Sequence, residues 1–332
     1  MKFGPVPVDE AEGCVLAHSV KAGDRKLKKG ITLKAADLAE LSAEGAEEII
    51  VARLDPGDVH ENDAAARLAA ALCPDPAVEN LKVTQPFTGR VNLIAETPGV
   101  VVLDTKAIEA FNAVHPMITV ATVPQFQQMA PGGMVATIKV ISYAVPGEAV
   151  EAACRVGEGS IRLAAPRHGT ASLVVTEIAG GPPHEKGIAA VRSRVEALGM
   201  ELTEPVIVPH RVPELADAIS DAPGEIVLIL TGSATSDPAD VAPEAVRRAG
   251  GAVERFGMPV DPGNLLFLGQ LGARPVIGLP GCARSPALNG ADWVLARVAC
   301  GIPTTGSDIA GMGVGGLLKE IPTRPQPRAG RV

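Results

Sequence analysis

Aromatic residues are scarce in this sequence. Only 2% of the 332 residues are Phe, Trp or Tyr, whereas proteins that bind single-stranded nucleic acid stack the bases on exposed aromatic side chains. An excess of positive charge is also lacking, because 30 Lys and Arg stand against 38 Asp and Glu, a net charge of −8. Duplex nucleic acid and anionic membranes are poor partners for such a chain. We therefore expect neither a nucleic-acid partner nor a membrane partner.

Paired cysteines and long apolar runs are lacking as well. The five cysteines contain no Cys-X-X-Cys motif, and the six histidines are scattered, so we predict no metal ligands and no disulfide framework. No apolar run approaches the ~18–20 residues of a membrane span. The first residues also lack the basic-then-apolar order of a signal peptide. These observations predict a soluble, cytoplasmic protein.

Glycine and proline are abundant, with 36 and 29 residues, which predicts many turns and short elements. The apolar share of 46% is enough for a substantial core, and the length indicates two or three domains. Charge is unevenly distributed: residues 231–332 carry ten Lys and Arg against eight Asp and Glu. A small anion would therefore bind more favourably in the last third of the chain.

The pattern of the sequence changes after residue 164. Residues 1–164 are predicted to form an N-terminal α+β accessory region, with two subdomains separated near residues 55–60 as an alternative. Residues 165–310 alternate strands and helices, which predicts an α/β domain with a doubly wound, mostly parallel sheet. Residues 311–332 form a Gly/Pro-rich C-terminal segment. The elements expected in the first region are helices at 37–41, 63–72 and 108–113 and strands at 49–51, 99–105 and 134–145.

Parallel sheets of this kind bind ligands beyond the carboxyl ends of their strands. The expected strands at 172–178, 205–209, 225–230 and 275–280 therefore direct attention to the loops that follow them. The helices expected on either side of the sheet are 187–199, 212–220, 242–250 and 285–300.

The loop TGSATSDPAD follows an apolar strand. Gly232 leaves space in which backbone N–H groups can meet a ligand, and Asp237 or Asp240 can cap the next helix, whose N-terminus attracts anions. The hydroxyl groups that can bind phosphate or carbonyl oxygens are those of Thr231, Ser233 and Thr235. The alternative is an ordinary capped loop between a strand and a helix.

The loop GLPGCARSP has a similar character. Gly281 shapes a tight turn, Ser285 is expected to cap a helix, and Arg284 can pair with a phosphate through two hydrogen bonds. Cys282 lies in the same loop, but no histidine near it in the sequence supports a nucleophilic role. The turn Pro262-Gly263-Asn264 is expected to reach the same edge.

The segment GMGVGG at 311–316 matches G-x-G-x-x-G literally. A dinucleotide site needs a strand before this motif and a βαβ unit around it, and only sixteen residues follow it. We interpret the segment as a packed or flexible C-terminal loop.

Taken in order, the three loop motifs resemble the MoaB/Mog-type molybdopterin-binding domain of molybdenum-cofactor biosynthesis proteins. TGSATSDPADVAPEA resembles the Gly-rich loop of that family, which ends in an aspartate, here Asp240, before a P-E-A helix start. PVDPGN resembles the P-G-K-P segment, and GLPGCARSP resembles the G-L-P-G-N-P-x-S turn. The pattern K-K-G-x-x-L-x-x-x-D-L-x-x-L-x-x-x-G in the N-terminal region is similar to the accessory segment of molybdopterin molybdenumtransferases. It also resembles chains that carry this module ahead of a nucleotidyltransferase domain.

The resemblance implies molybdopterin as ligand or substrate, with Mg²⁺ and molybdate taking part where molybdenum is inserted. It implies a homo-oligomer, and it implies a separate nucleotidyltransferase or a molybdoenzyme as partner. Asp240 is then the catalytic candidate, Arg284 offsets the charge of the pterin phosphate, and His210 lies at the edge of the site. The ligand-binding candidates are Thr231, Gly232, Ser233, Thr235, Asp237, Pro262, Gly263, Asn264, Gly281, Cys282, Arg284 and Ser285.

The sequence departs from the family pattern in four places. The loop TGSATS lacks a second consecutive glycine, His210 stands where an acidic residue is usual, Asn264 replaces a lysine, and Cys282 replaces an asparagine. We predict molybdopterin binding, for molybdenum insertion or for delivery to a nucleotidyltransferase. The departures at His210 and Asn264 favour the alternative of a non-catalytic carrier. A nucleotide or sugar-phosphate enzyme on the same type of sheet is the third interpretation.

Overall fold

The computed structural model describes residues 1–318, and its contacts divide the chain into two units. Unit 1 comprises Met1–Thr97, Val101–Gln125 and Pro131–Leu163. Among the described residues, unit 2 comprises Pro98–Val100, Phe126–Ala130 and residues 164–318. The two early segments of unit 2 lie far from the rest of it in the sequence and leave no local pattern that assigns them to it. They belong there because Val100 and Phe126 pack in its apolar core.

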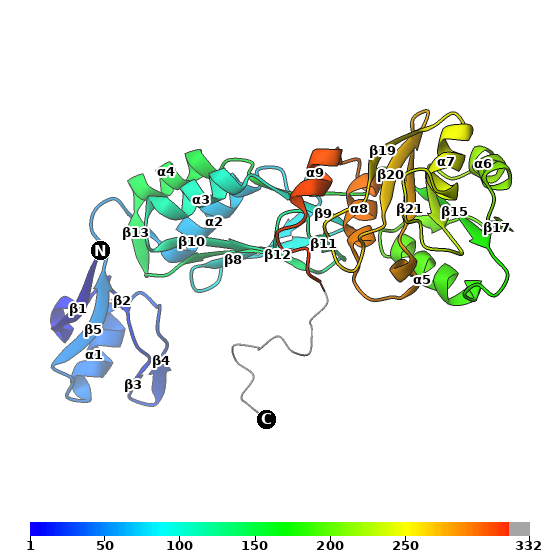
Figure 1. Cartoon of the computed structure of the whole chain (residues 1–332). Helices are drawn as coiled ribbons and strands as arrows, with labels where there is room; N and C mark the ends of the chain where they lie inside the picture. The colour runs from blue at the N-terminus through cyan, green and yellow to red at the C-terminus, as the bar shows by residue number, and fades with distance from the viewer. Residues whose placement is uncertain (319–332) are drawn as a thin grey trace, which may run out of the picture. The chain divides into compact units, whose positions relative to one another are not determined.

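Unit 1 consists of small antiparallel sheets and short helices (Figure 1). The strand orders within its sheets are β1-β5-β2, β10-β12-β8-β7, β13-β6 and β3-β4. The expected helix at 37–41 and strand at 49–51 lie in α1 and β5, and Gly45 adopts a φ of 80° just beyond α1. The elements are β1 (Lys2–Pro7), η1 (Val8–Glu10), β2 (Val15–Leu16), β3 (Val20–Ala22), β4 (Arg25–Leu27), α1 (Ala35–Ala43), β5 (Glu48–Arg53), β6 (Asp58–His60), α2 (Glu61–Leu72), β7 (Leu81–Val83), β8 (Arg90–Ala95), α3 (Thr105–Val114), β10 (Ile118–Thr122), β12 (Met134–Val140), β13 (Ala144–Pro146), α4 (Gly147–Gly157) and β14 (Ile161–Ala164). Strand β9 (Gly99–Leu103) has residues in both units, and β14 ends at Ala164, the first residue of the main part of unit 2.

Unit 2 is built around a seven-stranded sheet of order β16-β15-β18-β21-β20-β19, in which β17 also pairs with β15. The elements are β11 (Gln128–Met129), β15 (Thr170–Glu177), α5 (His184–Glu196), β16 (Glu201–Leu202), β17 (Val206–Pro209), α6 (Val212–Asp221), β18 (Ile226–Leu230), α7 (Val241–Arg248), β19 (Ala252–Phe256), β20 (Phe267–Leu271), β21 (Arg274–Leu279), η2 (Gly281–Arg284), α8 (Gly290–Ala299) and α9 (Gly306–Gly311). Strands β15 to β18 and β21 run parallel, whereas β19 and β20 are antiparallel. The predicted α/β class with a mostly parallel sheet is confirmed.

The central strands of unit 2 are apolar on both faces because helices cover both. Leu228 and Leu230 of β18 belong to one core cluster, which also contains residues of α5 and α8. Val227 and Ile229 belong to a second cluster with residues of α6 and α7. Successive side chains of a strand point to opposite faces, so the apolar run IVLIL supplies both clusters at once.

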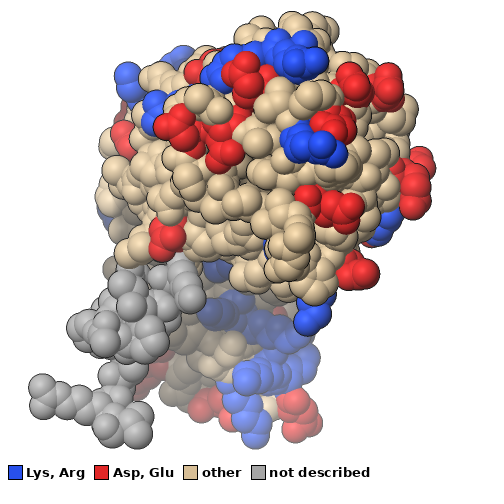
Figure 2. All heavy atoms as spheres, turned by 45° about the vertical axis from the view of Figure 1, so that its right-hand side comes forward, with Lys and Arg blue, Asp and Glu red and all other residues tan. Residues whose placement is uncertain are grey.

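On the face of the molecule that Figure 2 shows, acidic and basic side chains are interspersed.

One expectation about the end of the chain needs correction. The helix expected at 285–300 begins at Gly290 with Asn289 as its N-cap, so Ser285 does not cap it. Helix α9 was not expected. Residues 311–318 are grouped with unit 2, and Met312 is 4% exposed within its core.

The segment GMGVGG begins at the last residue of α9 and is not preceded by a strand, whereas a dinucleotide site needs a strand before this motif. The remainder of the predicted C-terminal segment, residues 319–332, lies outside the described residues. Within the described part of the chain, no helix combines the length and apolar character needed to cross a membrane.

Candidate functional site

The four parallel strands that carry the predicted loops end along one edge of the sheet. The registers place Glu177 beside Pro209, Val175 beside Leu230, and Leu230 beside Leu279. The loops that follow β15, β17, β18 and β21 therefore lie along one edge of the sheet, which we call the carboxyl edge. The predicted site residues belong to these loops or to the turn before β20.

Thr176 links three of these segments. The Gly232 N–H donates to Thr176 Oγ1 at 2.9 Å, and a 2.8 Å hydrogen bond joins the same oxygen to His210 Nδ1. A Cβ at Gly232 would lie 2.8 Å from the Thr176 carbonyl oxygen and 3.2 Å from the Ile178 nitrogen. The Gly232 N–H is therefore used within the protein, and the role of this loop in ligand binding stays a prediction. Glycine is required here by the close approach of two backbone segments.

The loop after β18 is held by its own hydroxyl groups. Thr231 Oγ1 donates to the Ser233 carbonyl at 2.6 Å and lies 3.3 Å from Thr235 Oγ1. Thr231 and Thr235 are buried, whereas the Ser233 side chain is exposed. The hydroxyl proton of Thr231 is committed to the Ser233 carbonyl, so this oxygen can serve any further partner only as an acceptor.

Asp240 is the N-cap of α7, as predicted. Its Oδ1 accepts from the Val241 N–H at 2.7 Å, and its Oδ2 accepts from the Ser236 N–H at 3.1 Å. Asp237 shapes the turn before it by accepting from the Ala239 N–H at 2.8 Å. Both carboxylate oxygens of Asp240 are thus engaged by the backbone. A structural role accounts for this residue, and its catalytic role remains a prediction.

Arg284 connects the loop after β21 to the loop after β18. Its Nη2 donates to the Thr231 carbonyl at 2.9 Å, while its Nη1 is buried and has no hydrogen-bond partner among the described residues. Burial lowers the pKa of this guanidinium, because desolvation disfavours the charged form. The side chain packs against Gly187 in the first turn of α5, where a Cβ would lie 2.9 Å from Nη1.

The loop that carries Arg284 is held by two residues that the sequence analysis missed. Arg194 of α5 is 9% exposed and donates to Asp292 and to several carbonyls of this loop. Asn289, 1% exposed, caps α8 and donates from Nδ2 to Cys282 Sγ at 3.0 Å. Asparagine before an apolar helix is an N-cap signal, which could have identified Asn289. No local pattern distinguishes Arg194 from a surface arginine.

The turn Pro262-Gly263-Asn264 lies at the same edge, because Phe267 at the start of β20 pairs with Gly278 near the end of β21. The Gly290 N–H donates to the Pro262 carbonyl at 2.8 Å, so the turn contacts the start of α8. Asn264 is exposed and its Nδ2 lies 3.4 Å from the Met258 carbonyl.

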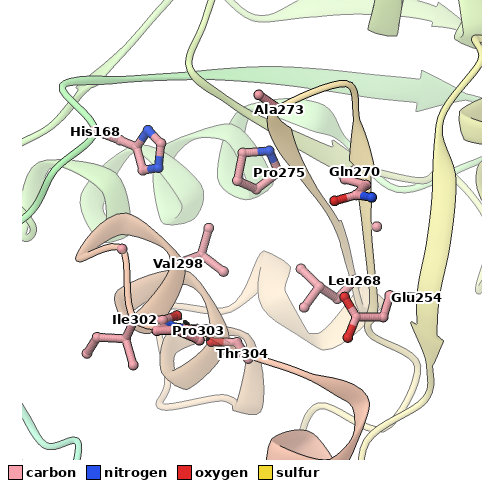
Figure 3. Close-up of a pocket in the computed structure, with 12 residues that line it drawn as sticks. His168, Glu254, Leu268, Gln270, Ala273, Pro275, Val298, Ile302, Pro303 and Thr304 are labelled. Carbon is pink, nitrogen blue, oxygen red and sulfur yellow. Dashed lines mark hydrogen bonds between the residues drawn. The ribbon is translucent and has the colours of Figure 1, made fainter.

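A second histidine adds to the carboxyl edge. His184, the first residue of α5, has Nε2 3.5 Å from Glu177 Oε2, and its Nδ1 is buried without a partner among the described residues. In contrast, a surface pocket of about 250 Å³ lies at the other end of the strands, between His168, Glu254 and Thr304 (Figure 3). It contains none of the predicted site residues, so we place the candidate site at the carboxyl edge.

The chain's own donor set does not suit a divalent cation at this edge. Among residues 1–318, no three side chains of His, Cys, Asp or Glu are grouped as ligands for a metal ion. Asp240, the carboxylate that the sequence suggests for this edge, already accepts two backbone hydrogen bonds.

Comparison with known proteins identifies the domain that contains this edge. Residues 174–297 match the family model described as a probable molybdopterin binding domain, which confirms the predicted resemblance for unit 2. Residues 5–53 match a domain of unknown function, DUF8806, so the proposed likeness of the N-terminal region to the accessory segment stays a prediction. No curated protein matches the chain.

Two solved structures are similar to the chain. One is the molybdopterin biosynthesis MoeA protein from Pyrococcus horikosii, with 16% identity, a TM-score of 0.31, and coverage of 91% of this chain and 76% of that chain. The other is a molybdenum cofactor biosynthesis protein from Pyrococcus furiosus, with 13% identity, a TM-score of 0.24 and coverage of 93% of this chain. This chain covers 65% of the second protein, slightly less than two thirds of its length.

Proposed function

We propose that this chain, with its probable molybdopterin-binding domain at residues 174–297, binds molybdopterin at the carboxyl edge and delivers it within molybdenum-cofactor biosynthesis. The ligand carries a phosphate, and an arginine is well suited to bind phosphate through paired hydrogen bonds. Delivery goes to a separate nucleotidyltransferase or to a molybdoenzyme.

The observation that carries this proposal is the state of Arg284. Its buried Nη1 has no partner among the described residues, and burial alone accounts for the lowered pKa of its guanidinium. A buried charged donor without a partner is costly. An anion bound here would satisfy Nη1 and stabilise the charge, so the loop is suited to a phosphate-bearing ligand.

Asp240 supports delivery more than molybdenum insertion. Both of its carboxylate oxygens accept backbone N–H groups, and this use explains the residue without a catalytic role. Molybdenum insertion remains the second candidate, because Asp240 occupies the position of the family's loop-ending aspartate. An asparagine at this position would still cap α7, so the two roles can be separated by experiment.

The test is a titration of the full chain with molybdopterin, followed by the fluorescence of the pterin. We expect Arg284→Ala to weaken binding about 10- to 100-fold, the range for a hydrogen bond to a charged group. Arg248→Ala is the matched control, because Arg248 is exposed in the last turn of α7; its affinity should be unchanged. Absence of saturable binding by the folded wild-type protein would refute the proposal.

A second measurement separates delivery from insertion. The chain is incubated with molybdopterin, Mg²⁺ and molybdate, and the molybdenum content of the bound pterin is measured. A delivering protein leaves that content unchanged in the wild type and in Asp240→Asn. Incorporation by the wild type that is lost in Asp240→Asn would instead establish molybdenum insertion with Asp240 as a catalytic group.

A further inference from the structure

We propose that Arg194 is a positioning residue that holds Arg284 in the orientation required for the ligand's anion, an inference that rests on the proposed function. Arg194 belongs to α5 and to none of the loops that the sequence predicts to bind the ligand. Helix α5 packs directly against η2, the short helix that contains Arg284.

The guanidinium of Arg194 holds the backbone on both sides of Arg284. Nη1 donates to the Ala283 carbonyl at 2.8 Å, and Nη2 donates to the Ser285 carbonyl at 2.7 Å. Nη2 also donates to the Ala287 carbonyl at 3.0 Å. Because the carbonyls before and after Arg284 are both fixed, the direction in which its side chain leaves the backbone is fixed as well.

The same face of α5 contacts the Arg284 side chain. Gly187 and Arg194 are separated by two helical turns, so they lie on one face of the helix. Gly187 provides the space for the Arg284 guanidinium, and Arg194 holds the backbone of the loop. Helix α5 therefore determines the position of both the backbone and the guanidinium of Arg284.

Arg194 is itself anchored by the start of α8. Its Nε donates to Asp292 Oδ1 at 2.7 Å, and Asp292 Oδ2 accepts from the Asn289 N–H at 2.7 Å. This arrangement uses donors on three different nitrogens. A lysine has the same charge but a single nitrogen, and it cannot reproduce the planar, forked geometry.

A double-mutant cycle tests whether Arg194 acts through Arg284. Molybdopterin binding is measured for the wild type, Arg194→Lys, Arg284→Ala and the double variant. We expect Arg194→Lys to weaken binding about tenfold in the wild-type background and less than twofold when Arg284 is already alanine. Arg192→Lys is the matched control on the same helix, because Arg192 donates to the Leu202 carbonyl and not to the loop.

Hydrogen exchange provides an independent readout. In Arg194→Lys, amides of residues 283–289 should exchange at least tenfold faster, while amides of β18 keep their wild-type protection. If Arg194→Lys also reduces the protection of β18, the milder variant Asp292→Asn is measured in its place, because asparagine keeps an oxygen that can accept from Arg194. Asp292→Asn should then accelerate exchange at residues 283–289.

The outcomes distinguish the two proposals. Equal weakening by Arg194→Lys in both backgrounds, or unchanged exchange at 283–289, would overturn the positioning role and leave the proposed function intact. Failure of the wild-type protein to bind molybdopterin would overturn the proposed function, and the positioning role towards that ligand with it.

Discussion

Replacing Gly232 with alanine should lower stability through a backbone conflict. The new Cβ would lie 2.8 Å from the Thr176 carbonyl oxygen and 3.2 Å from the Ile178 nitrogen, and neither atom can move without disturbing the end of β15. Overpacking of this kind costs ~1–3 kcal/mol. Displacement of the loop also weakens the hydrogen bond from the Gly232 N–H to Thr176, which adds about 1 kcal/mol. We therefore expect a loss of roughly 2–4 kcal/mol in the free energy of unfolding, measured by urea denaturation.

Gly281→Ala is the matched control. Gly281 lies in the other predicted ligand loop, and a Cβ there would meet no atom within 4 Å. Its free energy of unfolding should change by less than about 0.5 kcal/mol, as at other unconstrained surface positions. Equal stability of the two variants would refute the assignment of Gly232 to packing. The glycine would then have to be explained by the approach of a ligand.

Two further predictions concern titratable groups. Burial raises the pKa of the Cys300 thiol to about 11. At pH 8, iodoacetamide should therefore modify exposed Cys282 first and Cys300 only in denaturant, and peptide mass spectrometry measures both. Early modification of Cys300 would contradict its burial. N–H groups of Gly169 and Thr170 hold the pKa of Glu225 below its usual value, so this stabilisation is present above about pH 4.5 and is lost as the pH falls through the folded-state pKa. The difference in urea midpoint between the wild type and Glu225→Gln should therefore become smaller as the pH is lowered. A difference that does not change with pH would contradict the stabilising role of the Glu225 carboxylate.

The sequence was sufficient to predict the sheet and the ends of its strands. The apolar run of β18 needs helices on both faces, and the helix that follows needs a cap, which Asp240 provides. Both signals are local, because they depend on residues within a few positions of each other. The identity of the edge that collects the loops follows from the parallel order alone.

The features that the sequence did not reveal depend on long-range contacts. Ser285 has the residue type of an N-cap, yet α8 starts at Gly290 because Asn289 and Asp292 form a reciprocal capping pair there. Arg194 contacts carbonyls about ninety positions further along the chain, and carbonyl oxygens leave no mark on the sequence. Gly232 was singled out from its loop alone, but the contact that requires a glycine there is with the backbone of Thr176, 56 positions earlier in the chain.

The early segments of unit 2 affect how this domain can be produced and how it forms in the cell. A fragment that starts at Ala164 would lack Val100, which is fully buried, and Phe126, whose ring lies 4.1 Å from the Arg297 guanidinium carbon. Its core would contain a gap, and Arg297 would lose its aromatic partner. On the ribosome these segments emerge long before α8, so they remain without their final neighbours until α8 has been synthesised. Unit 2 therefore cannot be completed before its last helices have emerged, and a single proteolytic cut cannot release it intact.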